Sequence, residues 1–450
     1  MDRLTYSKEL NVRYDTDVFV AGGGPAGIAA AVSCARQGHS VFLAEGFSAF
    51  GGAAVTMLVP AFMTFGDGKN FLAEGIGREV YDRIGAESFP SFQKYCPSSI
   101  PAETLKRIYD DMVDGSGAEY LFHCQIIDAV VENGAIQYVI CAAKGEVFAV
   151  RAKVYVDCTG DGDLAAFAGA ETEYGNENGE TMAATLCGTW TGIDWSRVVK
   201  PDRRRLDDAF ADHIFTNEDR HMPGMWEIAA ESVTEDGTHL PDGIGGSNVG
   251  HVYGVDARYA DSLTKGIVRG RKQLMEYRRY YREYLSGYEN AELVTSAPFL
   301  GIRESRRITC DYRLVLDDFV KKAVFDDEIG RYCYGIDIHA GNNSAEGYQK
   351  FITEFNSLRC QPGESYGIPY RCLTVKGIEN LLTAGRCICT DRYLQSSVRV
   401  MPGCFITGQA AGIAAAVVCE SESTDVHSAD IRAIQSRLVR MGAYLPNYRA

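Results

Sequence analysis

This sequence has fewer basic than acidic residues: 45 Lys and Arg against 60 Asp and Glu, which gives a formal net charge of −15. Affinity for nucleic acid comes mainly from Lys and Arg side chains that neutralise phosphates, so the composition argues against a nucleic-acid partner. No uninterrupted apolar run approaches the ~20 residues that span a bilayer. The first residues also lack the apolar segment of a secretory signal. We therefore expect a cytoplasmic protein without a membrane partner.

The 14 cysteines form no recognisable framework. They are scattered through apolar segments of a long chain, which indicates buried, reduced thiols rather than disulfides. No cluster has the spacing of an iron–sulfur site. Cys387 and Cys389 are separated by one residue, and side chains so placed on a strand end should point to opposite faces. We therefore predict no redox dithiol and no metal site.

A glycine-rich turn near the N-terminus carries the first functional motif. Residues 17–21 are expected to form a buried strand, residues 28–37 a helix and residues 40–44 a second strand. The connecting turn has the pattern Gly-x-Gly-x-x-Gly, in which the first glycine permits a tight turn, the second admits a pyrophosphate and the third allows close packing. This turn contains Gly22, Gly24, Pro25, Ala26 and Gly27.

An acidic residue follows the second strand at the distance that a dinucleotide site requires. Glu45 is placed to accept hydrogen bonds from an adenosine ribose, and it disfavours a 2′-phosphate. The helix after the turn offers free N–H groups and a partial positive charge to phosphates. Because strand, turn, helix, strand and acid occur in the required order, we predict a dinucleotide site. This motif alone leaves FAD and NAD as alternatives.

Later segments favour FAD. A second glycine-rich turn at Gly51 and Gly52 suits the longer pyrophosphate–ribityl arm of a flavin. Strand-like runs at 120–124, 126–131, 135–141, 146–150 and 153–157 are separated by hairpin dipeptides. No second Gly-x-Gly-x-x-Gly follows a strand, because residues 243–246 lie in a polar stretch and are expected to form a loop. A separate NAD(P)H domain is therefore not predicted.

The C-terminal part contains a glycine-terminated strand and an apolar helix. Residues 377–386 are expected to form the strand and residues 405–418 the helix, and Pro402 lies where a first-turn proline is tolerated. Small residues share one helix face, which would let a sheet or a cofactor approach closely; they are Gly408, Ala411, Gly412 and Ala415.

Three segments together resemble a known family. The chain contains Thr-Gly-Asp-Gly-Asp at 159–163, Gly-Ile-Arg-Glu-Ser-Arg-Arg at 301–307, and Arg-Val-Met-Pro through Gly-Gln-Ala-Ala-Gly at 399–412. These motifs resemble those of the FAD-dependent oxidoreductases in the glutathione-reductase-like flavoprotein superfamily. The resemblance covers nearly the whole chain.

The resemblance implies an FAD site and assigns residues to it. The ADP and pyrophosphate contacts would come from the first two glycine turns and Glu45, and the adenine contact from the backbone of Ile126. The remaining implied contacts are Thr159, Gly160, Asp161, Gly385, Arg386, Pro402, Gly403 and Cys404. A helix N-terminus beneath the flavin would stabilise the negative charge that reduction creates.

The implied fold class is α/β. A Rossmann-like FAD-binding domain, with a parallel sheet and a β-meander, would comprise residues 1–165 and 372–450. A mixed α+β cap or substrate domain would be inserted between them at 166–371. The FAD is expected to be noncovalent, because residues 46–70 contain no His or Cys to attach the flavin.

Catalytic candidates are few in this chain. His251 lies in a glycine-flanked segment of the insert, and Arg303 suits a substrate carboxylate, carbonyl or hydroxyl. Arg399 precedes the flavin-facing helix, and Tyr393 is a possible proton relay. Arg306 and Arg307 are interpreted as ion-pair partners, whereas His339 could be structural or functional.

The predicted function is an FAD-dependent oxidoreductase, a dehydrogenase or reductase that transfers hydride between the flavin and a small polar organic molecule. An external electron donor or acceptor is required, and the sequence does not identify it. Two alternatives stay open: a tRNA-modifying flavoprotein, which the acidic composition disfavours, and a flavin-binding protein without turnover.

Overall fold

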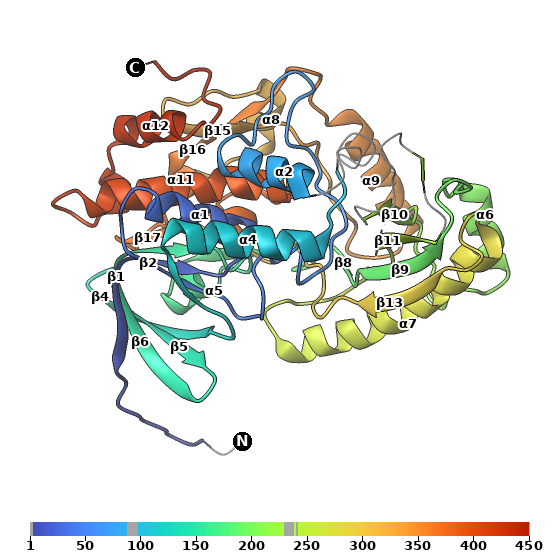
Figure 1. Ribbon diagram of the computed structural model, residues 1–450, viewed down its shortest axis with the longest axis horizontal. Coiled ribbons are helices and arrows are strands. Elements are labelled where there is room, and N and C mark those ends of the chain that lie inside the picture. Colours follow the sequence, from blue (N-terminus) through green and yellow to red (C-terminus); the bar gives the residue numbers. More distant parts are fainter. Residues whose placement is uncertain (1–2, 88–97, 229–237, 240–241, 450) are drawn as a thin grey trace.

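The computed structural model describes residues 3–87, 98–228, 238–239 and 242–449. Its largest sheet has seven strands in the order β3-β2-β1-β6-β5-β4, with β17 also paired to β6 (Figure 1). The strands are β1 (Val12–Ala21), β2 (Val41–Ala44), β3 (Glu119–Leu121), β4 (Gln125–Glu132), β5 (Ala135–Ala143), β6 (Glu146–Asp157) and β17 (Leu381–Thr383).

Strand β6 joins two kinds of sheet. Its C-terminal half lies parallel to β1 and β17, and its N-terminal half pairs antiparallel with β5. The sequence predicted separate strands at 146–150 and 153–157, and the structure shows one continuous strand. Because the C-terminal end of β6 belongs to the parallel part, the turn at 158–162 lies beside the glycine turn after β1.

Helices α1 (Pro25–Ala35), α4 (Ala102–Ser116) and α11 (Met401–Cys419) pack beside one another over this sheet (Figure 1). The small residues of α11 face α1: a Cβ on Gly408 or Gly412 would clash with the α1 backbone at Ala26 or Ala30. These glycines therefore allow two helices to approach, rather than the sheet or cofactor that we predicted.

Helix α11 is long and apolar enough to cross a membrane by length and composition, which our sequence reading did not anticipate. However, 94% of its most apolar window is buried within the protein. Its surroundings are α1, β15 and α12, so it is a core helix. The helix begins at Met401 and has Pro402 in its first turn, as the sequence predicted.

A second hydrophobic cluster lies beside the main one. It contains residues between Ala184 and Ile302, with Trp190 and Tyr281 fully buried in it. Its four-stranded antiparallel sheet has the order β10-β11-β9-β13, and the 25-residue helix α7 (Ala260–Tyr284) contributes Leu274 to its core. The strands are β9 (Gly188–Ile193), β10 (Gly224–Glu227), β11 (Gly243–Asn248) and β13 (Glu292–Ser296).

Our loop prediction for residues 243–246 was wrong. These residues begin β11, whose Gly243, Gly245 and Gly246 pair with β9. A Cβ on Gly246 would approach Pro60 to 2.5 Å, so the glycines are required by close packing rather than by a turn. The division into two domains stays a prediction. Buried residues between Ile308 and Ile368, which we predicted within the insert, belong to the larger hydrophobic cluster.

The remaining elements connect these two cores or cover them. The helices are α2 (Ile76–Glu87), α5 (Asp163–Phe167), α6 (Arg203–Ala211), α8 (Leu316–Lys321), α9 (Ala345–Ser357), α10 (Arg392–Val398) and α12 (Ile431–Arg440), with 3-10 turns η2 (Tyr370–Cys372), η3 (Gly385–Cys387) and η4 (Val426–Ser428). The short strands are β7 (Thr172–Tyr174), β8 (Ala184–Thr185), β12 (His251–Val252), β14 (Arg306–Ile308), β15 (Glu328–Tyr332) and β16 (Tyr366–Pro369).

Candidate functional site

A cavity of about 520 Å³ runs between the glycine turns of the large sheet and the second hydrophobic cluster. Most of the predicted cofactor residues line it. They are Gly22, Gly24, Pro25, Ala26, Glu45, Gly52, Ile126, Thr159, Gly160, Asp161, Gly385, Arg386 and Cys404. Gly27, Gly51, Pro402 and Gly403 lie behind this wall and are not part of the lining.

The three glycines of the first turn have different surroundings. A Cβ on Gly24 would meet only the Cα of Gly52, 3.9 Å away, so the space in front of this backbone is open. A Cβ on Gly27 would clash with the carbonyl oxygen of Gly22. Gly24 caps α1 without a side-chain hydrogen bond, which leaves the helix N–H groups available to an anion.

Glu45 is held in position by the backbone of its own turn. Its carboxylate accepts hydrogen bonds from the N–H of Gly23 at 2.6 Å and of Phe47 at 2.8 Å. Burial raises the pKa of Glu45, although these N–H groups act in the opposite direction. A carboxylate has about four acceptor sites, so it retains capacity for a ribose hydroxyl.

The opposite wall comes from the C-terminal segment. Val400, Met401 and Cys404 place the uncapped N-terminus of α11 at the cavity. Arg386 forms an ion pair with Asp161 at 2.9 Å, while its buried Nη1 has no hydrogen-bond partner among the described residues. Open glycine backbone, two helix N-termini, a buried carboxylate and an unpaired guanidinium nitrogen together fit the two phosphates and ribose of FAD.

A comparison with protein families agrees with this geometry. The family model described as FAD dependent oxidoreductase matches residues 17–438. The chain belongs to the FAD-dependent oxidoreductases. It is therefore an FAD-binding flavoprotein, and the residues above fit its cofactor.

No curated protein matches the chain significantly. Among solved structures, the flavin-dependent brominase Bmp2 is 14% identical, with 95% of this chain and 83% of that one covered and a TM-score of 0.45. The p-nitrophenol 4-monooxygenase PnpA from Pseudomonas putida is 11% identical, with coverages of 95% and 84% and a TM-score of 0.45. A geranylgeranyl bacteriochlorophyll reductase-like protein from Thermoplasma acidophilum is 11% identical, with coverages of 96% and 88% and a TM-score of 0.45.

Two further arginines, Arg303 and Arg399, line the cavity. Arg303 donates to the carbonyl of Ala183 at 2.8 Å, to Thr185 Oγ1 at 2.7 Å and to Asn248 Oδ1 at 3.1 Å. All three acceptors are neutral, and the side chain is buried. Burial and the nearby Arg399 lower the pKa of Arg303. The guanidinium is thus fixed in place without a carboxylate of its own.

Arg399 has weaker partners. Its Nη2 lies 3.3 Å from the carbonyl and 3.4 Å from the Oδ2 of Asp337, and its Nε has no partner among the described residues. Asp337 is shared with His339, whose Nε2 is 3.3 Å from Asp337 Oδ1. One carboxylate therefore contacts both a histidine and an arginine. Arg303 adds a second positive charge to the same cavity wall.

His251 does not line the cavity. Its Nδ1 lies 2.7 Å from Asp219 Oδ2, and its Nε2 lies 2.8 Å from the Nδ1 of His339, which does line the cavity. Burial lowers the pKa of His251 to about 4, although Asp219 acts to raise it. Burial and Arg303 lower the pKa of His339 as well. Both shifts favour the neutral imidazole.

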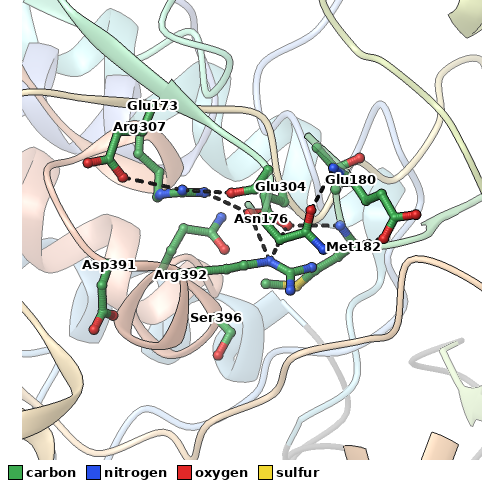
Figure 2. Close-up of polar contacts among 12 residues, drawn as sticks. Glu173, Asn176, Glu180, Met182, Glu304, Arg307, Asp391, Arg392 and Ser396 are labelled. Carbon is green, nitrogen blue, oxygen red and sulfur yellow. Dashed lines mark hydrogen bonds and ion pairs between the residues drawn. The ribbon is translucent and has the colours of Figure 1, made fainter. Parts of the chain in front are cut away.

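Arg306 and Arg307 form the ion pairs that we predicted. Glu304 is buried; its carboxylate accepts from Arg307 Nη1 at 2.6 Å, from Arg392 Nε at 3.0 Å and from the N–H of Met182 at 2.8 Å (Figure 2). Arg306 pairs with Asp163 at 2.8 Å. Glu304 therefore links α10 to the segment before β14. Through their ion pairs, Arg306 and Arg307 fix the segment that carries Arg303.

Tyr393 points toward α9. Its hydroxyl donates to Glu354 Oε1 at 3.3 Å, and the residue does not line the cavity. The cysteines that the structure describes are free, and the Cys387 thiol lies beside Thr383 while that of Cys389 hydrogen-bonds Cys310. Sequence reasoning missed the contributions of Asp337, Asn248 and Asp219, because no local motif marks them.

Proposed function

We propose that this flavoprotein transfers hydride between its FAD and a small organic acid, whose carboxylate is bound by Arg303 and Arg399. The observation that carries the proposal is the charge of the cavity wall. Arg303 and Arg399 lie together on one part of the wall with Asp337, whereas the third lining guanidinium, Arg386, pairs with Asp161. An anionic substrate group would complete this charge balance, since Arg presents a planar fork that matches a carboxylate.

The chain's own residues would bind and orient the substrate. Bound FAD supplies the hydride chemistry. Arg303 is held by Thr185 and Asn248, so its orientation is fixed before the substrate arrives and little side-chain entropy is lost on binding. The second hydrophobic cluster covers the same cavity, which would exclude water and strengthen these charge interactions.

We also propose that the chain belongs to the glutathione-reductase-like superfamily, although the solved structures above are a halogenase, a monooxygenase and a reductase-like protein. The support is a parallel sheet followed by a meander, with a C-terminal strand returning to β6. The segment around β8 to β13 would act as the cap that carries Arg303.

The experiment is anaerobic bleaching of the flavin absorbance. Purified holoenzyme would be mixed with 2-hydroxy acids and 2-amino acids, and separately with the matching neutral alcohols and amines. We expect the carboxylates to bleach the flavin at much lower concentrations. Equal bleaching by the neutral compounds would contradict the proposed role of the arginine pair.

A variant series makes the assignment specific. Arg303→Met removes a charged donor worth about 1.5–3 kcal/mol, so the substrate concentration for half-maximal bleaching should rise by roughly 10- to 150-fold. Arg279→Met is the matched control, because that arginine is exposed, pairs with Glu283 on α7 and does not line the cavity. FAD content should remain unchanged in Arg303→Met, and an unchanged substrate dependence would refute the assignment.

A further inference from the structure

Three imidazoles from distant parts of the chain meet next to the cavity. His221 lies in the loop between α6 and β10, His251 lies in β12, and His339 lies in the loop after β15. One ring nitrogen from each lies within 4.8 Å of the other two. The rings of His221 and His251 are 4.2 Å apart, centre to centre.

Each imidazole also faces a carboxylate through its other nitrogen. Asp219 Oδ2 is 2.7 Å from His251 Nδ1, and Asp219 Oδ1 is 3.2 Å from His221 Nδ1. Asp337 Oδ1 is 3.3 Å from His339 Nε2. Metal-ligating histidines almost always donate their second N–H to a carboxylate, carbonyl or water, which fixes the tautomer and the ring orientation. All three rings have this arrangement.

Proton counting gives two arrangements for the chain Asp219, His251, His339, Asp337. Two neutral imidazoles carry two protons in total, and ionised carboxylates carry none. These protons can fill the two hydrogen bonds that His251 makes to Asp219 and to His339, and the His339 Nε2 lone pair then faces Asp337 Oδ1 at 3.3 Å. If both carboxylates instead receive an N–H, the His251 Nε2 and His339 Nδ1 lone pairs face each other at 2.8 Å. In that second arrangement a third proton or a metal ion bound by the two nitrogens removes the conflict.

His221 supplies a third lone pair. With its Nδ1–H directed at Asp219, the buried Nε2 is left without a hydrogen-bond partner among the described residues. Phe351 lies 4.7 Å from this ring and Tyr348 lies 5.1 Å from it, centre to centre, so water has little access from that side. A buried nitrogen without a partner is costly unless something binds it.

We propose that His221, His251 and His339 bind a divalent transition-metal ion of the zinc class. Neutral imidazoles suit Zn²⁺ and related ions rather than Ca²⁺ or Mg²⁺. Zn–N bonds of about 2.0–2.1 Å place tetrahedral nitrogens roughly 3.4 Å apart. The present separations extend from 2.8 Å to within 4.8 Å, so small ring movements reach this geometry. Asp219 and Asp337 balance the charge of the ion, and three protein ligands leave a fourth position open.

The decisive experiment measures metal and flavin separately. FAD-loaded protein would be stripped with a chelator, dialysed against micromolar Zn²⁺, and analysed for zinc by mass spectrometry and for flavin by absorbance. We expect one bound Zn²⁺ per chain. Less than half an equivalent in the wild-type protein would overturn the metal site. Because the zinc content is read independently of flavin bleaching, this result and the failure of the proposed function are distinguishable.

Conservative variants test the individual ligands. His221→Asn and His251→Asn keep an amide near the Nδ1 position that faces Asp219 and remove Nε2, whereas His339→Gln removes Nδ1. Replacing residues that only orient ligands costs 10- to 100-fold in metal affinity, so each ligand variant should lose more than about 100-fold. His213→Asn is the control, because this histidine is exposed and has a positive φ of 54° that Asn tolerates.

Two further measurements distinguish the loss of a metal ligand from unfolding. FAD content and melting temperature are measured for every variant. His221→Asn, at the edge of the cluster, is the variant least expected to disturb the core. Zinc binding by His221→Asn equal to that of His213→Asn would refute the ligand set and leave a hydrogen-bonded histidine cluster in its place. Loss of zinc with retention of FAD would support it.

Discussion

Replacing Gly24 by valine should abolish FAD binding while leaving the fold intact. Gly24 has φ −71° and ψ −175°, an extended conformation that valine adopts without strain. Its Cβ would have only the Gly52 Cα within 4 Å, at 3.9 Å, so the new side chain projects into the open cavity. There it occupies the volume through which a pyrophosphate reaches the N-terminus of α1.

The expected loss follows from the contacts that valine would block. A hydrogen bond to a charged group contributes about 1.5–3 kcal/mol, so losing two N–H bonds to the phosphates weakens FAD binding by roughly 3–6 kcal/mol. This corresponds to a dissociation constant raised by about 10²- to 10⁴-fold. The assay is the flavin-to-protein ratio after gel filtration, followed by titration of the apoprotein with FAD and fluorescence detection.

A neighbouring glycine supplies the contrast. Gly27→Val would force its Cβ against the Gly22 carbonyl oxygen, so that variant should lose stability as well as FAD. The apoprotein of Gly24→Val should melt within a few degrees of wild-type apoprotein. A Gly24→Val protein that purifies with a full flavin spectrum would refute the placement of the cofactor.

Three further predictions concern the FAD linkage, the buried Glu304 and the contact between His427 and Asp311. Acid precipitation should release the yellow colour into the supernatant, and a yellow pellet would disprove noncovalent FAD. Glu304→Gln leaves two arginines without their shared carboxylate and should lower the free energy of unfolding by about 3–5 kcal/mol; chemical denaturation measures this, with the exposed Glu292→Gln as a control of little effect. Burial acts to lower the pKa of His427, but its hydrogen bond to Asp311 outweighs this and the pKa is raised. That contact stabilises the protein below the unfolded pKa and is lost as pH rises through the folded one, so His427→Gln should lower the melting temperature more at about pH 5.5 than at about pH 8.5; equal losses would contradict it.

Local sequence determined the cofactor half of this protein. The first glycine turn, its flanking strands and Glu45 occupy about thirty consecutive residues, and their roles depend on backbone conformations that glycine permits and on the direction of a helix. Each can be inferred without knowing what packs above the sheet. The same is true of the first-turn proline in α11, although the partner of its small residues was predicted incorrectly.

Tertiary structure alone decided the other half of the site. Arg303, Arg306 and Arg307 lie within five residues of one another, yet one lines the cavity and two form ion pairs, because their surroundings come from β7, β8, β11 and α5. The histidine cluster shows the same limit: Asp219 and His251 are 32 residues apart and His251 and His339 are 88 apart. We predicted no metal site from short-range spacing, and our proposal departs from that prediction. Spacing carries no information about loops that meet only in the folded protein.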